Sequence, residues 1–218
     1  MKKILFVVVL LLAATVAQAA DRVTVVLVGG AGSNQSHMEF LAENIPNAIN
    51  IVPDRLWPFV DAAADIWQKI QETGVDGKLI LVGHSFGGLI SRRIANDHPE
   101  AVVAVVTISS PAGGFWACPK WIFRPGDEDS NVPLYVIAAH KQGLEKWFFR
   151  GENDGTVDVV SVLDVGREAA DIVVLTGLDH MEVLQSEKVV NIINSWIAPR
   201  IHAQFASAER ILEMEIAQ

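Results

Sequence analysis

The serine at position 85 has the sequence surroundings of a nucleophile. Gly83-His84-Ser85-Phe86-Gly87 matches the pattern G-x-S-x-G and lies between a short apolar run and an amphipathic stretch. A strand that turns at once into a helix holds the serine at a strained corner, with its hydroxyl beside the positive end of the helix. The N–H of Phe86 would point at a developing oxyanion. The alternative is a glycine-rich turn with an exposed serine and no chemistry.

His84 precedes this serine in the motif. In the geometry of such a corner its side chain faces away from the hydroxyl, so we assign it to packing and to the wall of a substrate pocket.

A serine needs a base, and the base needs an acid that orients it. His180 follows the last apolar run and precedes the closing helical pattern, which makes it the first candidate for the base, with His140 as its rival. Asp154 lies in the turn Asn153-Asp154-Gly155 and is the first candidate for the acid, exposed at a loop tip. Asp158 is the second choice.

A glycine-rich loop follows the first apolar run. Gly29-Gly30-Ala31-Gly32 would let backbone donors approach a ligand closely, and the N–H of Ala31 is the expected second oxyanion donor. Gly30 is expected to line the substrate site. A nucleotide site is the weaker alternative, because Gln35 replaces the third glycine of G-x-G-x-x-G and no Walker lysine follows.

Short apolar runs alternate with helical patterns along the chain, which predicts an α/β fold. Apolar runs without alternation indicate strands buried on both faces, as in a parallel sheet of about six strands with helices on both sides. Catalytic residues then belong beyond the carboxyl ends of the strands. The expected strands are 23–28, 48–52, 79–82, 102–108, 134–139 and 172–175. The expected helices are 35–44, one that begins near 58 and ends near 74, 86–97 and 181–197.

These motifs resemble those of the α/β-hydrolase superfamily, and within it the lipase- and esterase-like members. The similar segments are Gly83–Leu89, Val106–Gly114 (VTISSPAGG), Asn153–Ser161 (NDGTVDVVS) and Leu178–Leu184 (LDHMEVL). The resemblance implies the three-layer hydrolase fold, Ser85, Asp154 and His180 as a triad, Ala31 and Phe86 as oxyanion donors, and no cofactor or metal.

The sequence also departs from the family pattern. The usual His-Gly before the oxyanion residue is Gly29-Gly30, and Ala112 rather than His follows Pro111. We also expect the two early strands of the larger fold to be absent.

Residues 111–132 are the candidate lid. Phe115 and Trp116 lie there and are expected to contact substrate, so that exposed aromatic side chains would suit an acyl chain or a lipid surface. Core packing of a short helix is the alternative. Residues 199–218 carry apolar residues at helical spacing and predict a separate C-terminal helical tail.

The amino terminus predicts export. Lys2 and Lys3 precede an uncharged apolar run, and Ala17-Gln18-Ala19 has small residues where a signal peptidase cleaves. We therefore expect a signal peptide at 1–19, a hydrolase domain at 20–198, and a periplasmic or secreted protein; an uncleaved membrane anchor is the alternative. Loss of the two lysines takes the formal net charge from −9 to −11, which argues against nucleic acid as a partner. A transient contact with a lipid surface remains compatible with the sequence.

The sequence therefore favours an exported serine hydrolase that cleaves small or lipid-like carboxylic esters. An amidase or a thioesterase would use the same groups and remains open. A non-catalytic binding protein on the same fold is a third reading, which an intact serine, aspartate and histidine in this order disfavour.

Overall fold

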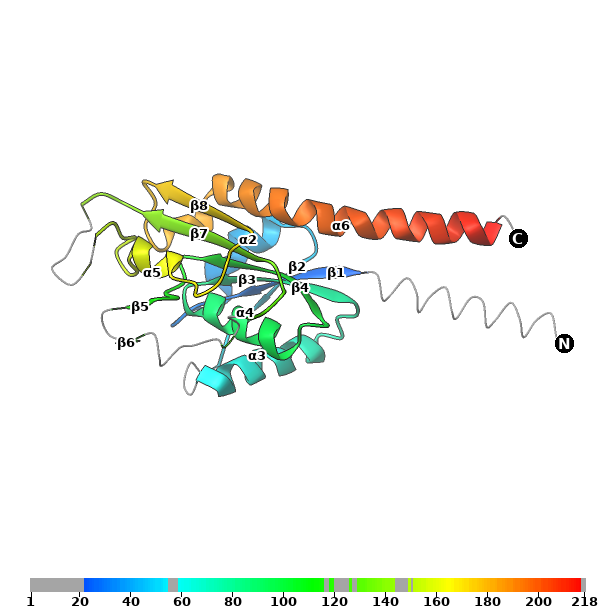
Figure 1. The fold of residues 1–218 in the computed structure, drawn as a ribbon, viewed down its shortest axis with the longest axis horizontal. Helices are drawn as coiled ribbons and strands as arrows, with labels where there is room; N and C mark the ends of the chain where they lie inside the picture. Colours follow the sequence, from blue (N-terminus) through cyan, green and yellow to red (C-terminus); the bar gives the residue numbers. More distant parts are fainter. Residues whose placement is uncertain are drawn as a thin grey trace.

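A parallel β-sheet forms the centre of the computed structural model, which describes residues 22–54, 59–115, 118–119, 126, 129–143, 149 and 151–216. The strand order is β2-β1-β3-β4-β7-β8 and every neighbouring pair is parallel (Figure 1). The predicted sheet of about six strands is confirmed. The strands are β1 (Val23–Val28), β2 (Ala48–Ile51), β3 (Lys78–His84), β4 (Val102–Ile108), β7 (Leu134–His140) and β8 (Asp171–Thr176).

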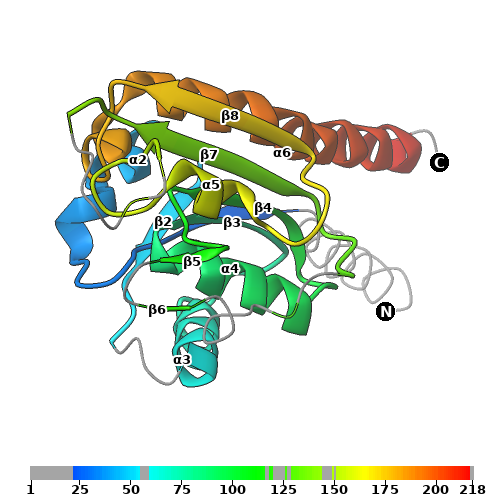
Figure 2. The ribbon, with the colours of Figure 1, turned by 60° about the vertical axis from the view of Figure 1, so that its left-hand side comes forward.

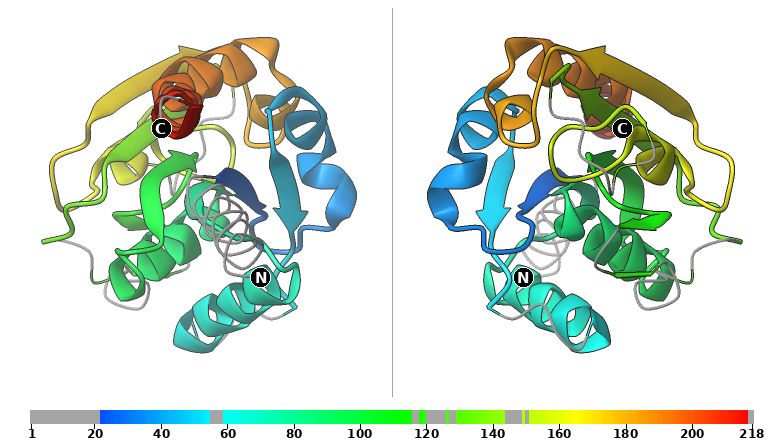
Figure 3. Two further views of the ribbon diagram at one scale, coloured as in Figure 1. Left: turned by 90° about the vertical axis from the view of Figure 1, so that its right-hand side faces the viewer. Right: turned by 90° about the vertical axis from the view of Figure 1, so that its left-hand side faces the viewer.

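Helices cover both faces of this sheet, as the unbroken apolar strands predict (Figure 3). In β1, Val26 packs into the core under one group of helices while Val25 and Leu27 pack into the core under the other. The first group is α3 (Phe59–Glu72), α4 (Phe86–Asp97) and α5 (Val159–Leu163). The second is α2 (Glu39–Asn44) and α6 (Glu187–Ile216), each preceded by a 3₁₀ turn, η1 (Gln35–Met38) and η3 (Glu182–Gln185).

The direction of winding reverses between β1 and β3. From β1 the chain forms β2 on one side, then returns to form β3 on the other side, and the later strands follow outward. Loops that leave the carboxyl ends of two such strands diverge, and open α/β sheets bind ligands in the resulting crevice. Gly29 and Gly30 follow β1, and Ser85 follows β3. The fold therefore brings the glycine-rich loop and the serine to this point.

The candidate lid contains regular structure. Within it β5 (Gly114–Phe115) and β6 (Cys118–Pro119) form an antiparallel pair (Figure 2). The Phe115 side chain and the whole of Trp116 lie outside the described residues, as does the predicted signal peptide at 1–19. No helix within the described ranges is long and apolar enough to cross a membrane.

A single helix, α6, replaces the predicted closing helix and separate tail. It begins at Glu187, after the turn η3, and continues through Pro199 to Ile216, so its end projects past the sheet (Figure 1). Proline removes one helical hydrogen bond, but Ile197 and Ile201 on either side of it are both buried. Arg200 also donates a hydrogen bond to the carbonyl of Trp196 at this point. Packing and this side chain together allow the helix to continue.

Candidate active site

Ser85 lies at a sharp corner between β3 and α4. Its φ of 53° and ψ of −124° make it one of three non-glycine residues with positive φ in the described ranges. The corner is held by a bond from the Ser85 N–H to the carbonyl of Ile108 (2.8 Å) and one from the Gly88 N–H to the Ser85 carbonyl (3.1 Å). A strained backbone that neighbouring strands and helices over-determine is characteristic of functional positions.

The glycines of the motif are required by close backbone approach. A Cβ on Gly83 would collide with the backbone of Gly87 and Gly88, and a Cβ on Gly87 would collide with the carbonyl of Val28. Helix α4 therefore packs directly on β3 and β1, which places its N-terminal turn beside Ser85. The Phe86 N–H, the expected oxyanion donor, belongs to this turn.

The loop after β1 lies against the serine. A Cβ built on Gly30 would be 2.8 Å from the Ser85 Cβ and 3.0 Å from the His84 carbonyl oxygen. Only glycine fits in this space, so the backbone of Gly30 lies against Ser85, while its role in lining a substrate site stays a prediction. Ala31 follows and is exposed, at the position where a second backbone donor is expected.

His180 lies in the loop after β8 and contacts Asp154 twice. Its Nδ1 is 2.7 Å from Oδ2 of Asp154, and its backbone N–H donates to the carbonyl of Asp154 at 2.9 Å. A carboxylate on Nδ1 fixes the tautomer in which Nε2 is free to accept a proton. The two first candidates for base and acid are therefore brought together.

Asp154 is buried, which corrects the expectation of an exposed loop tip. Its exposed fraction is 1%, and Oδ1 accepts hydrogen bonds from the N–H groups of Thr156 (2.9 Å) and Val157 (2.7 Å). Burial alone would raise the pKa of Asp154, but the hydrogen bond and charge of His180 and the two amide donors outweigh it and hold the pKa below its usual value. The carboxylate is thus kept ionised.

His84 is packed in the interior, as the sequence predicts, and its partner there is His180, which the sequence did not indicate. Its Nε2 is 2.9 Å from the His180 carbonyl oxygen, and the two ring centroids are 4.5 Å apart. The side chain is 3% exposed. Burial first, and then the neighbouring His180, lower the pKa of His84 to about 3, so the ring is neutral.

The rival candidates His140 and Asp158, and Asp179 next to His180, make other contacts. His140 ends β7 with its Nε2 4.0 Å from Glu152, while its carbonyl accepts from the N–H of Gly177. Asp179 accepts from the N–H groups of Met181 and Glu182 and so shapes the turn after it. Asp158 immediately precedes α5.

Lys141 joins the acid loop to the histidine loop, and no sequence motif points to it. Its N–H donates to the carbonyl of Asn153 (3.0 Å), and its Nζ lies 2.6 Å from Glu182 and 3.3 Å from Asp179. These two carboxylates lie on either side of His180 in sequence. The available signal was position, because Lys141 directly follows β7 at the carboxyl edge of the sheet.

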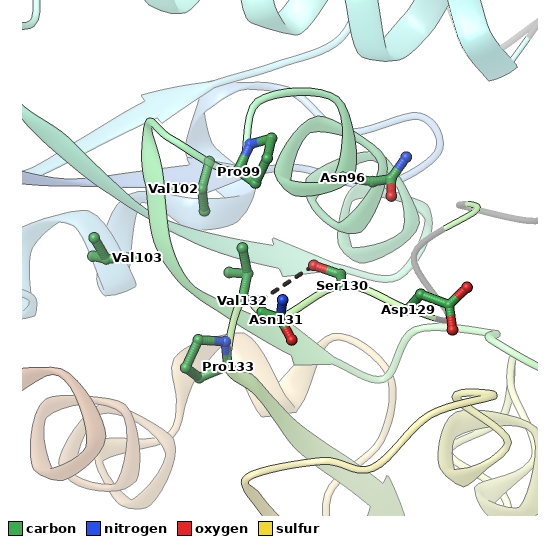
Figure 4. Close-up of a pocket in the computed structure, with 9 residues that line it drawn as sticks. All are labelled: Asn96, Pro99, Val102, Val103, Asp129, Ser130, Asn131, Val132 and Pro133. Atoms are coloured by element: carbon green, nitrogen blue, oxygen red, sulfur yellow. Dashed lines mark hydrogen bonds between the residues drawn. The ribbon is translucent and has the colours of Figure 1, made fainter.

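A separate open pocket of about 460 Å³ lies at the opposite edge (Figure 4). It is lined by Val102 at the start of β4 and by Val132 and Pro133 before β7, and none of Ser85, Asp154 and His180 borders it. In the described ranges no cluster of three or more His, Cys, Asp or Glu side chains is arranged to hold a metal ion.

Comparison with known proteins agrees with this architecture. The family model described as the alpha/beta hydrolase fold matches residues 24–131. No curated protein matches the sequence.

Solved structures of the same fold cover most of the chain at low identity. Est1E from Butyrivibrio proteoclasticus has a TM-score of 0.61 at 12% identity, covering 84% of this chain and 90% of its own. A structure described with the metagenome-derived lipolytic enzymes LipS and LipT has a TM-score of 0.59 at 15% identity, covering 82% and 94%. A thermophilic esterase from Thermogutta terrifontis has a TM-score of 0.58 at 14% identity, covering 82% and 90%.

Proposed function

Since the chain belongs to the α/β-hydrolase superfamily, we propose that it is an exported serine hydrolase that cleaves carboxylic esters through an acyl-enzyme. Ser85 Oγ attacks the acyl carbon while Nε2 of His180 takes its proton, and Asp154 stabilises the imidazolium that forms. The N–H groups of Ala31 and Phe86 stabilise the oxyanion.

The two half-reactions use the same groups. When the tetrahedral intermediate collapses, the alcohol leaves with the proton from His180 and the acyl group remains on Ser85. Water then attacks the acyl carbon, gives its proton to His180, and releases the acid as Ser85 regains its proton. Neither half requires a metal or a cofactor.

One observation carries the proposal: His180 is held by Asp154 on one side and lies against the residue that precedes Ser85 on the other. A base with a carboxylate on Nδ1, in contact with the residue that precedes a serine at a strained strand–helix corner, has the groups that acyl transfer needs. Gly30 adds a side-chain-free backbone against the same serine.

The ester substrate is inferred from the neighbours and the candidate lid. LipS and LipT are described as lipolytic, and the protein from Thermogutta as a thermophilic esterase. Phe115 and Trp116 in the lid sequence suit an apolar acyl group. The signal-peptide pattern at 1–19 supports the export part of the proposal, and the acidic balance of the chain suits small or lipid-like esters better than polyanions.

The test is activity-based labelling combined with a substrate series. A fluorophosphonate probe should label the wild-type protein and not Ser85→Ala, and p-nitrophenyl esters of rising acyl length should be hydrolysed only by the wild type. Both proteins should unfold at similar temperatures. Ester turnover by a folded Ser85→Ala protein refutes the proposal, and a wild type that neither labels nor turns over any ester indicates a binding protein.

A further inference from the structure

His84 is the last residue of β3 and is bonded directly to Ser85 in the chain. Its side-chain contact with His180 therefore links the residue next to the serine to the loop that carries the base. These two segments are far apart in the sheet, because β4 and β7 lie between β3 and β8. Without this contact, the position of His180 relative to Ser85 would depend on the loops that follow β3, β7 and β8.

The hydrogen bond defines the protonation of His84. A backbone carbonyl can only accept, so the nitrogen 2.9 Å from the His180 oxygen, Nε2, must carry the proton. The neutral ring then has its lone pair on Nδ1. Because burial lowers the pKa of His84 to about 3, the ring is in this state at neutral pH.

A neutral His84 is also what a neighbouring base requires. The ring centroids of His84 and His180 are 4.5 Å apart, and two cationic imidazoles at that distance would repel each other. With its pKa lowered to about 3, His84 stays neutral and adds no repelling charge when His180 takes the proton of Ser85.

His180 is consequently held at three points. Asp154 bonds its Nδ1 and its N–H, and His84 bonds its carbonyl oxygen. The first two contacts fix the ring against the acid loop. Of the three contacts, only the third connects His180 to the corner that carries Ser85. A displacement of about 1 Å between reacting groups can cost roughly 10²-fold in rate.

We propose that His84 is a positioning residue: by donating from Nε2 to the His180 carbonyl it fixes the distance between His180 and Ser85. This inference rests on the proposed function, in which Ser85 is the nucleophile and His180 the base. The role differs from lining the substrate pocket, because it predicts a change in kcat rather than in KM.

Two variants separate the donor from the ring. His84→Phe keeps an aromatic ring against His180 and removes the donor, which also leaves a carbonyl without its partner. His84→Gln replaces the ring by an amide whose nitrogen can take the place of Nε2. We expect kcat for p-nitrophenyl butyrate to fall by about 10- to 100-fold in His84→Phe with KM changed less than about twofold. His84→Gln should restore kcat to within about fivefold of the wild type.

His98→Phe is the matched control. His98 lies at the far end of α4, where its ring stacks on Trp67 at 3.8 Å, so phenylalanine preserves the stacking there. This variant should keep the wild-type kcat. The rate of fluorophosphonate labelling should follow kcat in all three variants. Wild-type kcat in a folded His84→Phe protein, or equal loss in His84→Gln and His84→Phe, overturns the positioning role.

The tautomer of His84 can be measured on the wild-type protein, so this test does not depend on the folding of a variant. In ¹⁵N-labelled protein, NMR of the ring nitrogens should report the Nε2–H tautomer for His84 at neutral pH; an Nδ1–H tautomer rules the bond out.

Ser85→Ala distinguishes failure of the proposed function from failure of the positioning role of His84. If Ser85→Ala keeps activity, the proposed function fails; if it loses activity while His84→Phe keeps it, only the role of His84 fails.

Discussion

Asp154 and His180 are joined by two hydrogen bonds, one between side chains and one between backbones. The Nδ1–Oδ2 distance is 2.7 Å, and the His180 N–H donates to the Asp154 carbonyl at 2.9 Å. The backbone bond fixes how the two loops meet, and the side-chain bond then fixes the imidazole. The pair therefore depends on the fold of both loops as well as on the charge of the carboxylate.

Asp154→Asn tests the charge without removing the shape. An amide can still accept from Thr156 and Val157, but it no longer stabilises an imidazolium and can select the wrong tautomer of His180. We expect kcat for p-nitrophenyl esters to fall by about 10³- to 10⁴-fold. Asp158→Asn is the control for the second candidate acid, and a larger loss in that variant would reassign the role.

The lowered pKa of Asp154 also predicts how stability depends on pH. Its folded pKa lies below the ordinary value of 3.8, so near pH 4 the unfolded chain binds more protons than the folded one. The ionised carboxylate therefore stabilises the fold above about pH 4, and this contribution is lost as pH falls through the lowered pKa. Urea unfolding from pH 6 to pH 2.5 should show the difference in unfolding free energy between wild type and Asp154→Asn narrowing in acid. A difference independent of pH would contradict this.

The strands and the serine corner were predictable because their signals are local. Val23–Val28 and Val102–Ile108 are apolar runs with clear ends, and β1 and β4 occupy these same residues. Helix α4 likewise covers Phe86–Asp97 as predicted. In a parallel sheet the carboxyl ends of the strands lie at one edge. Ser85 and His180 each follow such an end, so a predicted parallel sheet already places both of them there.

The remaining features depend on contacts between distant segments. Asn-Asp-Gly is good turn chemistry, yet whether that turn is exposed depends on how the loops after β7 and β8 pack, and Asp154 is buried between them. The direction of His84 depends on a histidine 96 positions away. Pro199 is a local stop signal that packing on both sides overrides, so α6 continues.

Gly30→Ala should impair catalysis at the serine itself. A methyl group there would be 2.8 Å from the Ser85 Cβ and 3.4 Å from its Oγ, so either the loop or the serine must shift. We expect kcat to fall by about 10²-fold, comparable to losing one oxyanion donor. Gly74→Ala is the control, because Gly74 has φ +70° and open space around it. That variant should lose about 1 kcal/mol of stability from backbone strain and keep its kcat. Equal kcat in both variants would remove Gly30 from the site.

Lys141→Met should weaken the connection between the two loops in a salt-dependent way. The ammonium lies 2.6 Å from Glu182 and 3.3 Å from Asp179, and all three side chains are about one-third to one-half exposed. The nearby carboxylates raise the pKa of Lys141, the hydrogen bond to Glu182 first, so it stays charged. Because exposed ion pairs are screened, we expect a loss of about threefold in kcat at low ionic strength that largely disappears near 1 M salt.

The matched control is Lys78→Met, at the amino end of β3, where Nζ donates to the carbonyl of Glu100. It removes an equal charge at the opposite edge of the sheet and should leave kcat unchanged at every salt concentration. The comparison isolates the position of Lys141 from the change in net charge. If both variants respond to salt alike, the effect belongs to the charge of the whole molecule, and Lys141 does not hold the histidine loop in register with the acid loop.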